Sequence, residues 1–333
     1  MSGNFSLACL LTNYLTKAIC DIRGFHDSIA DSITDFITAF ELLVDLYASW
    51  SPPLSTSQCT YFVQYPRNAA SVLGWYGHCG EAIVRRLAAE GYAVTVNDVA
   101  ANRHDVERLV AGLNRTHGQG TSVGIIADVT SSSEVKSMVA ESCQRLGPLA
   151  VMVANAGIAP IGAALDISDE DVSQTMGVNF AGVWNCYTHA ARQMIAQGPV
   201  PEGSTGYKII GASSIAAYKP FPLLAHYCAS KGAVRSLTQV FAIEMARHKI
   251  NVNCYAPGIV GTAMWEHIDR TLGKMQGRAE GQTIQKYVTE LTAMGRVSVP
   301  DDVAKVVGGF LCGPDSEFVT GQNIVVDGGI VFT

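Results

Sequence analysis

A regular alternation of short β-branched runs with longer segments of helical period begins near residue 67 and constrains this chain more than any other feature. Runs such as YAVTVND and LAVMVANAG have the length and composition of strands, whereas NRHDVERLVAGLNR and SSEVKSMVAESCQRLG have the spacing of amphipathic helices. Strands that alternate with helices form parallel sheets through right-handed crossovers. Because the alternation continues to QNIVVDGG, it predicts an α/β fold with a doubly wound, seven-stranded parallel sheet and helices on both faces.

The first 66 residues do not share this alternation. Apolar residues recur at helical spacing between residues 32 and 49, and SPPLSTSQ at residues 51–58 has the composition of a linker. We therefore expect two parts, a mostly helical or irregular N-terminal extension over 1–66 and one α/β domain over 67–333. The role of the extension is unknown. A docking helix is favoured, while a membrane-surface helix and a poorly ordered segment stay open.

Composition excludes several classes of function. The chain is 48% hydrophobic and 16% charged, with a formal net charge of −6, and has no basic block that would bind nucleic acid or anionic lipid. Its nine cysteines lack zinc-ligand spacing, so no metal site is expected. Neither a membrane span nor a secretion signal is apparent. These features predict a cytoplasmic protein whose partner is a small molecule.

A glycine-bearing turn between a strand and a helix holds a pyrophosphate with backbone amides and the helix N-terminus. Here that turn contains Gly74, Gly77 and Gly80. Asp98 closes the following strand, where a carboxylate binds ribose hydroxyls and repels a 2′-phosphate. The pattern predicts NAD(H) as the preferred cofactor, with NADP(H) possible. Asp128, which follows the third strand, would lie beside adenine, although a turn or cap explains it equally well.

The stretch HYCASKGAVRSLTQ places Tyr227 and Lys231 four positions apart at the start of a helix, on one face. A phenol with a pKa of about 10 is a poor base at neutral pH, and a neighbouring ammonium together with an oxidised nicotinamide favours the phenolate. Ser214, at the end of a strand, can donate a hydrogen bond to a substrate oxygen. Ser213 should point to the opposite face. This pattern predicts Tyr227 as an acid and base between a carbonyl and an alcohol.

These motifs together resemble the short-chain dehydrogenase/reductase family. The resemblance spans residues 69–333 and is carried by GYAVTVND, ADV, NAG, VNFAGV, GASS, YCASK and APGIVGT. PGIVGTAMWEHIDR, GRVSVPDDVA and TGQNIVVDGGIVF are similar to the acetoin (diacetyl) reductase and 2,3-butanediol dehydrogenase branch. The resemblance implies a Rossmann-like fold and hydride transfer between a nicotinamide cofactor and a ketone or secondary alcohol. It also implies a homodimer or homotetramer that pairs long helices at about 169–197 and 224–247.

Individual roles follow from the same resemblance. Asn179 would hold a water that connects Lys231 to solvent, unless it is an interior helix asparagine bonded to backbone. The catalytic set is then Asn179, Ser214, Tyr227 and Lys231. The residues expected to bind the cofactor are Gly74, Gly77, Gly80, Asp98, Asp128, Val129, Asn155, Gly157, Tyr227, Lys231, Val260 and Thr262.

The expected substrate pocket is mainly apolar, with Phe221, His226, Met264 and Trp265 in its wall. Such a wall fits a ketone or secondary alcohol that resembles acetoin or diacetyl, or a larger hydrophobic one. The glycine-rich, charged segment GKMQGRAEGQ, residues 273–282, has the composition of a lid that orders on binding or of a solvated loop.

The first glycine turn departs from the family pattern Thr-Gly-x-x-x-Gly-x-Gly. Leu73 stands in the threonine position and His78 in that of the middle glycine, so an imidazole is expected to hinder close approach of the backbone to phosphate. This departure supports an alternative, a catalytically silent scaffold with impaired cofactor binding. Retention of all four catalytic positions favours the enzyme.

Overall fold

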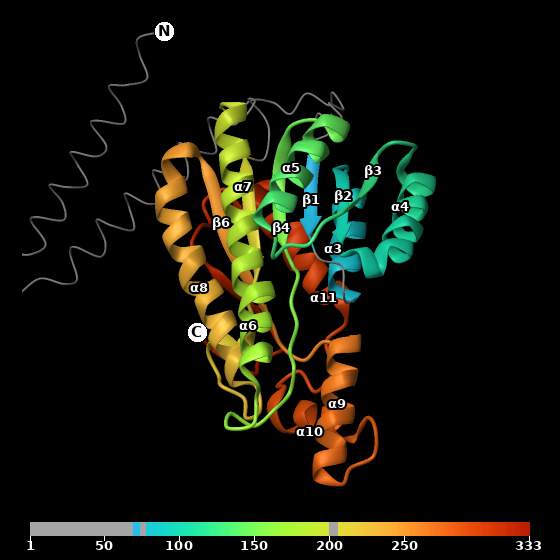
Figure 1. Ribbon diagram of the computed structural model, residues 1–333, viewed down its shortest axis with the longest axis vertical. Coiled ribbons are helices and arrows are strands. Elements are labelled where there is room, and N and C mark those ends of the chain that lie inside the picture. The colour runs from blue at the N-terminus through green and yellow to red at the C-terminus, as the bar shows by residue number, and fades with distance from the viewer. Residues whose placement is uncertain (1–68, 74–77, 200–205) are drawn as a thin grey trace, which may run out of the picture. The chain divides into compact units, whose positions relative to one another are not determined.

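The protein is represented by a computed structural model that describes residues 69–73, 78–199 and 206–333 (Figure 1). The predicted extension over 1–66 lies outside the described residues, and so do Gly74 and Gly77 of the glycine turn. The boundary between extension and domain therefore stays a prediction.

The described residues form one seven-stranded sheet in the order β3-β2-β1-β4-β5-β6-β7, and every neighbouring pair is parallel. The predicted doubly wound α/β sheet is confirmed. The chain reverses its direction of travel across the sheet between β1 and β4, which is where open α/β sheets bind ligands. The strands are β1 (Ala69–Leu73), β2 (Ala93–Asp98), β3 (Ser122–Ile126), β4 (Leu149–Ala154), β5 (Tyr207–Ala212), β6 (Ile250–Pro257) and β7 (Asn323–Val326).

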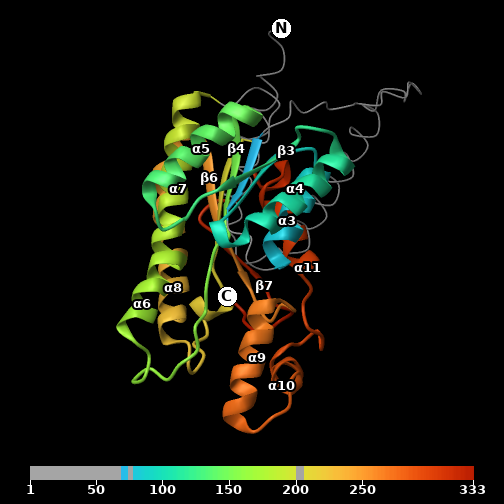
Figure 2. The same ribbon diagram turned by 45° about the vertical axis from the view of Figure 1, so that its right-hand side comes forward.

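Helices cover both faces of this sheet (Figures 1 and 2). On one face lie α3 (His78–Ala89), α4 (Arg103–His117) and α11 (Pro300–Ala304), which is continued by the π-helical turn Lys305–Leu311. On the other face lie α5 (Ser132–Leu146), α7 (Gly182–Gln197) and α8 (Ala225–Met245). Beyond the sheet, α9 (Ala263–Gln276) and α10 (Gln282–Leu291) form a separate helical pair. Among the described helices, none is both long and apolar enough to cross a membrane.

The helix expected over 169–197 is not regular throughout. It begins as α6 (Asp169–Met176), capped by the Ser168 hydroxyl, which accepts a hydrogen bond from the Asp171 amide at 3.0 Å. It then widens into a π-helical turn over Gly177–Ala181 before α7. Such insertions are rare and often occur at functional sites. Here the turn contains Asn179, one of the predicted catalytic residues.

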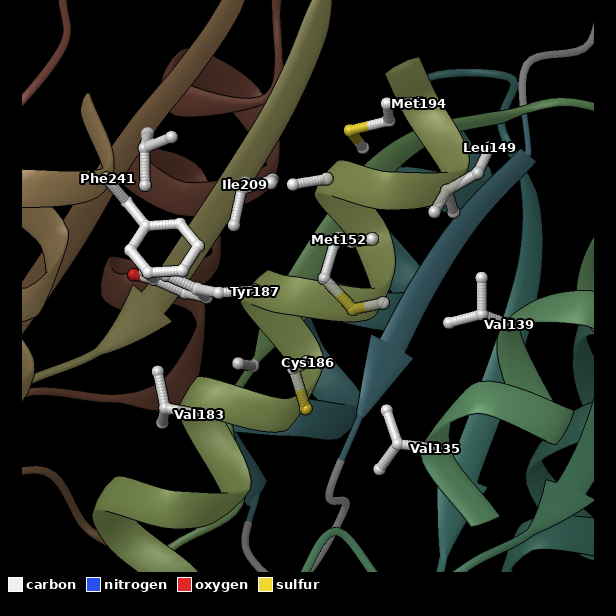
Figure 3. Close-up of a cluster of buried hydrophobic side chains, with 14 of the residues drawn as sticks. Val135, Val139, Leu149, Met152, Val183, Cys186, Tyr187, Met194, Ile209 and Phe241 are labelled. Atoms are coloured by element: carbon white, nitrogen blue, oxygen red, sulfur yellow. The ribbon is translucent and has the colours of Figure 1, made fainter. Parts of the chain in front are cut away.

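The two larger hydrophobic clusters of the described residues lie one on each face of the sheet, as expected when strands are buried on both sides, and a third, smaller cluster contains Ile259 and Val288. In the cluster of Figure 3, Met152 of β4 and Ile209 of β5 pack against α7. The Tyr187 phenol at its centre is fully buried and forms a hydrogen bond with the Thr238 hydroxyl at 2.9 Å, so its polar atom is satisfied. A side chain at Gly211 would clash with the Tyr187 ring, and glycine thus permits close packing of β5 on α7.

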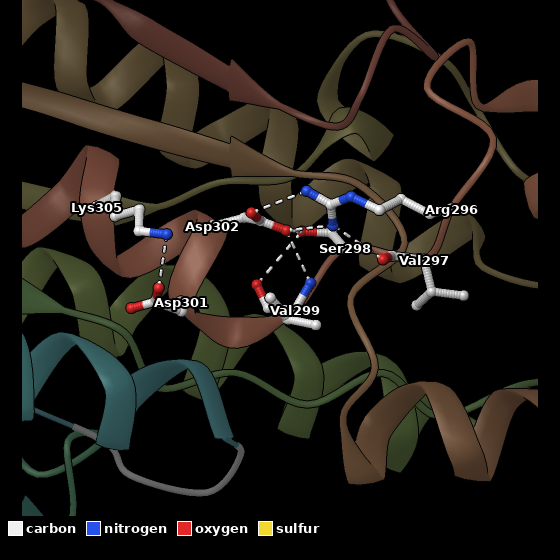
Figure 4. A network of polar contacts seen from close by, with 7 residues as sticks. All are labelled: Arg296, Val297, Ser298, Val299, Asp301, Asp302 and Lys305. Carbon is white, nitrogen blue, oxygen red and sulfur yellow. Dashed lines mark hydrogen bonds and ion pairs between the residues drawn. The ribbon is translucent and has the colours of Figure 1, made fainter.

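A polar network fixes the segment that leads from α10 to α11 (Figure 4). The Arg296 guanidinium donates to both oxygens of Asp302, at 2.7 and 3.0 Å, and this pair holds the pKa of the Asp302 carboxyl well below its usual range. Asp302 also accepts from the Val299 amide at 2.9 Å and the Ser298 hydroxyl at 3.1 Å. Ser298 in turn pairs with Val260 in a parallel bridge, so the network positions the turn after β6.

Candidate active site

A cavity lies at the carboxyl ends of β4, β5 and β6, beside the first turns of α8. Its polar wall contains three of the four predicted catalytic residues, Ser214, Tyr227 and Lys231. These residues come from the end of β5 and from one face of α8. The opposite wall is apolar and is contributed largely by α9 and α10. The cavity therefore combines a small polar group with an extended apolar surface, as small-molecule sites generally do.

The Tyr227 phenol lies close to both of its predicted partners. The Lys231 ammonium nitrogen is 5.6 Å from the centre of the Tyr227 ring, and the Ser214 side chain forms a hydrogen bond with Tyr227. Lys231 is only 3% exposed, and its Nζ donates to the Ala212 carbonyl at 2.8 Å. That hydrogen bond ties α8 to the end of β5.

Burial dominates the acidity of this pair. It raises the pKa of Tyr227 to about 12, against the lowering effect of the hydrogen bond with Ser214. It lowers the pKa of Lys231 from 10.5 to about 8. The sequence led us to expect that the ammonium and an oxidised nicotinamide together favour the phenolate; in the protein without the cofactor, desolvation is the largest effect on the Tyr227 pKa. Tyr227 is therefore protonated at neutral pH.

The two adjacent serines both line the cavity, but their hydroxyls have different partners. The Ser213 hydroxyl donates to the Lys231 backbone carbonyl at 3.2 Å and accepts from the side-chain amide of Asn323 at 3.3 Å. The Ser214 hydroxyl instead forms a hydrogen bond with Tyr227 and accepts from the Ala216 amide at 3.1 Å. Ser213 thus holds backbone together, while Ser214 is the serine beside the phenol.

Asn179 is fully buried and joins the loop after β4 to α8. Its Oδ1 accepts from the Ile158 amide at 2.8 Å, and its Nδ2 donates to the Ile158 carbonyl at 2.9 Å and to the Ser230 hydroxyl at 3.0 Å. An added Cβ on Gly157 would lie 3.2 Å from the Lys231 Nζ and 3.4 Å from the Asn179 Oδ1. Asn179 and Lys231 therefore meet at Gly157, whose lack of a side chain leaves room there.

The residues expected near the nicotinamide line the same cavity. Asn155 follows β4, and its Oδ1 accepts a hydrogen bond from the Tyr255 hydroxyl at 2.5 Å. Val260 and Thr262 follow β6 and are both buried. The Thr262 hydroxyl caps α9 through the Trp265 amide and donates to the Val260 carbonyl at 3.2 Å.

The predicted adenosine-side acids lie at the ends of neighbouring strands. Asp98 ends β2, is 5% exposed, and its Oδ1 accepts from the Val99 amide at 2.7 Å and the Asn102 side chain at 3.0 Å. Asp128 follows β3, is exposed, and its Oδ1 accepts from the amide and the hydroxyl of Thr130, both at 2.8 Å. Each carboxylate thus holds its own turn.

The remaining predicted binding residues lie close to the cavity or to these turns. Val129 is buried, and its carbonyl accepts a hydrogen bond from the side-chain amide of Asn185 at 2.9 Å. Gly80 is buried in the first turn of α3, and His78, the first residue of that helix, is exposed.

Three of the four predicted substrate residues, Phe221, Met264 and Trp265, line the cavity. His226 is not among the lining residues. It is 5% exposed, and its ring nitrogens have no hydrogen-bond partner in the described part of the chain. On a helix, a residue next to Tyr227 points about 100° away from it, so His226 cannot share the face that Tyr227 and Lys231 present to the cavity.

Comparison with known proteins shows which family has this architecture. A family model described as Enoyl-(Acyl carrier protein) reductase matches residues 79–331. A short-chain dehydrogenase/reductase of Armillaria gallica is 40% identical over 76% of this chain and 92% of its own length. The chain belongs to the short-chain dehydrogenase/reductase family. The resemblance seen in its motifs is thereby confirmed.

Further relatives lie in the expected branch of this family. L-2,3-butanediol dehydrogenase of Corynebacterium glutamicum is 38% identical over 79% of this chain and 98% of its own length. Diacetyl reductase [(S)-acetoin forming] of Staphylococcus epidermidis is 34% identical with the same coverage. The solved structure of a dehydrogenase/reductase from Sinorhizobium meliloti superposes with a TM-score of 0.69 at 29% identity, over 80% of this chain and 96% of that one.

Short-chain dehydrogenases/reductases use nicotinamide cofactors, and the residues here fit such a group. Gly157 is a place where any side chain would press on Lys231, and Gly258 is one where it would press on Asp327, at 2.6 Å. Both glycines line the cavity beside Asn155 and Val260, so the backbone itself forms its surface there. No group of three or more His, Cys, Asp or Glu side chains in the described ranges could hold a metal ion.

Sequence reasoning missed several cavity residues of this family member. Tyr255 belongs to none of the motifs and has the sequence context of an ordinary strand residue, yet its phenol donates a hydrogen bond to Asn155. Ile268 and Leu272 of α9 follow the helical spacing of Trp265, a signal that could have identified them. Tyr287 reaches the cavity from α10, and only the tertiary structure brings it there.

Proposed function

We propose that this protein transfers a hydride between a nicotinamide cofactor and a ketone or secondary alcohol, with Tyr227 as the acid and base. The observation that carries the proposal is that Tyr227 lies close to both Ser214 and Lys231, and that all three line one largely apolar cavity. Membership of a family of dehydrogenases and reductases supports the same type of reaction.

In the reductive direction, Tyr227 donates its proton to the carbonyl oxygen while the bound cofactor supplies the hydride to the carbon. A phenol whose pKa is raised to about 12 keeps this proton at neutral pH, so the enzyme is ready for reduction. Ser214 stabilises the developing negative charge on the same oxygen by a hydrogen bond. In the oxidative direction, Tyr227 must first lose its proton, which the positive charge of Lys231 favours.

Lys231 and Asn179 are proposed to return the proton to Tyr227. Support comes from their approach to each other at Gly157 and from the hydrogen bond that Asn179 makes to Ser230, one turn from Tyr227. The Asn179 amide is already bonded to the Ile158 backbone, so it also fixes the loop that borders the cavity.

The preference for NAD(H) over NADP(H) is proposed on Asp98. Its buried position at the end of β2 supports this, because a negative charge there disfavours a 2′-phosphate. A homodimer or homotetramer is supported by apolar side chains on the outer surfaces of α7 and α8, among them Trp184, Val240 and Ile243. A cytoplasmic location stays a prediction.

The substrate class is proposed from the apolar wall and from the relatives. Two of these relatives are named for 2,3-butanediol and diacetyl, which are small alcohol and ketone substrates. Lys231 is the only ionisable cation in the cavity lining of the described chain, so a carboxylate or phosphate on the substrate has no separate partner there. An acetoin-like compound and a larger hydrophobic ketone both fit these conditions.

The test is a panel of ketones and secondary alcohols assayed with both nicotinamide cofactors, together with a titration of NADH fluorescence. We expect saturable NADH binding and turnover of at least one uncharged ketone. Absence of NADH binding at millimolar concentration would overturn the proposal in favour of a silent scaffold, the role that His78 in the glycine turn would support.

A further inference from the structure

A buried carboxylate connects the two helices that form the apolar wall of the cavity. Asp269 of α9 is 3% exposed. Its Oδ2 accepts from the Gly281 amide at 2.5 Å and its Oδ1 from the Ile284 amide at 2.8 Å. Gly281 and Ile284 lie at the N-terminus of α10, where amides have no partner within the helix and where negative charge is favoured. Asp269 thus caps α10 from a different helix.

The backbone between the two helices is held by a few hydrogen bonds of its own, with the Arg278 amide donating to the Gly273 carbonyl at 2.8 Å and the Gln282 amide to the Ala279 carbonyl at 3.2 Å. Residues 277–281 contain Gly277 and Gly281, both with positive φ, at 65° and 85°. The nearby ion pair between Arg270 and Glu280 is long, at 3.9 Å, and both side chains are exposed, so it contributes little. Asp269 therefore supplies the strongest polar link between α9 and α10.

The position of α10 affects the cavity because this helix contributes Tyr287 to the cavity wall. Tyr287 lines the cavity and packs edge-on against the Trp265 ring, with centroids 6.5 Å apart. Trp265, Ile268 and Leu272 of α9 form the adjoining surface. Asp269 follows Ile268 directly and lies one turn from Trp265 and from Leu272, so the residue that holds α10 lies at the edge of the helix face that lines the cavity.

We propose that Asp269 is a positioning residue that determines how tightly the substrate is bound. It holds α10 against α9 so that Tyr287 completes the apolar wall, and it acts on the substrate through Tyr287 without touching it. This inference rests on the proposed ketone and alcohol chemistry. It predicts an effect on KM for the ketone, because the cofactor residues and the Tyr227 group lie on other elements.

The kinetic test uses Asp269→Ala, Tyr287→Ala and the double variant, with Glu280→Ala as a control that breaks only the exposed ion pair. Asp269→Ala should raise KM for the best ketone of the panel about tenfold, as expected for loss of two hydrogen bonds to a carboxylate. We expect kcat to change less than about threefold and NADH affinity to be unchanged, with Glu280→Ala close to the wild type.

The double variant separates positioning from general destabilisation. If Asp269 acts through Tyr287, the double variant should have nearly the KM of Tyr287→Ala alone. Additive effects, or an unchanged KM in Asp269→Ala, would overturn the inference. Equal losses in kcat, KM and NADH binding would also overturn it, because they indicate unfolding of the whole site.

A second measurement does not depend on turnover. Trypsin cleaves after Lys274, in the last turn of α9, and after Arg278, within the linker, and Asp269→Ala should be cut there faster than the wild type. Identical cleavage rates would show that Asp269 does not hold the helical pair. If the wild-type protein reduced no ketone, the proposed function would fall, whereas the cleavage rates would still decide whether Asp269 anchors α10.

Discussion

The two ends of the proposed cofactor site are built differently. At the nicotinamide end, the polar groups are buried and are bonded to elements distant in sequence, as when Asn179 joins Ile158 and Ser230. At the adenosine end, the carboxylates of Asp98 and Asp128 accept hydrogen bonds from Val99, Asn102 and Thr130, all within four positions along the chain. A change at the first end disturbs several elements at once. A change at the adenosine end alters only one turn and its local charge. Proton transfer at the nicotinamide end and cofactor preference at the adenosine end can therefore be tested separately.

Tyr227→Phe should have the largest effect. Removal of one oxygen eliminates the proton donor while the buried ring keeps its packing, so we expect kcat to fall about 10³-fold or more. NADH binding should change less than about threefold. Steady-state kinetics with the best ketone and an NADH fluorescence titration measure these two quantities. A variant that kept its activity would show that another group moves the proton.

Lys231→Met should lower kcat about 10²-fold and also stabilise the protein at neutral pH. Lys231 has its pKa lowered from 10.5 to about 8, so between these values the unfolded chain binds more protons and the stability of the wild type rises with pH. Below about pH 8 the full cost of the buried charge is present, on the order of 3 kcal/mol before the lost hydrogen bond to Ala212 is deducted.

Melting temperatures of the wild type and of Lys231→Met at several pH values show whether the substitution stabilises or destabilises the protein. Lys231→Met should melt above the wild type at pH 7, and the difference should shrink as the pH rises from about 8 towards 10.5. A variant that melts below the wild type at every pH would mean that the Lys231 hydrogen bond to Ala212 outweighs the cost of burial. This second outcome would make the nicotinamide end a source of stability as well as of chemistry.

The nicotinamide end could be predicted from sequence because local periodicity determines it. Helical spacing puts Tyr227 and Lys231 on one face. The same reasoning gave the doubly wound, seven-stranded parallel sheet. It could not give the raised pKa of Tyr227 in the protein alone, because the desolvation that raises it depends on the packed structure.

The apolar wall could be predicted only in part. Met264 and Trp265 follow the last motif directly, but Tyr287 lies more than twenty residues further on, beyond a glycine-rich, charged segment. That segment has the composition of a lid or a solvated loop, and most of its charges are indeed exposed. Asp269 and Tyr287 acquire their roles only when α10 folds back on α9, a tertiary contact that has no periodic signal in the sequence.

At the adenosine end, Asp98→Asn should shift cofactor preference without loss of turnover. The amide oxygen can still accept from the Val99 amide, while the negative charge that opposes a 2′-phosphate is removed. We expect the ratio of kcat/KM for NADPH to that for NADH to rise about tenfold. Asp128→Asn is the matched control, since that carboxylate is exposed and is expected to have the smaller effect. Equal shifts in both variants would indicate a general effect of net charge.

His78→Gly should have the smallest effect. The direction of the change in NADH affinity shows whether the imidazole hinders or helps binding of the phosphate at the glycine turn. If the imidazole hinders close approach of the backbone to phosphate, glycine should lower the Kd for NADH about threefold. His78 is the exposed first residue of α3, so the loss of helix propensity is limited to one terminal position. His78→Ala is the control, because it removes the imidazole but keeps a Cβ. If both variants bound NADH more weakly than the wild type, the imidazole would be a phosphate donor, and this departure from the family pattern would strengthen cofactor binding.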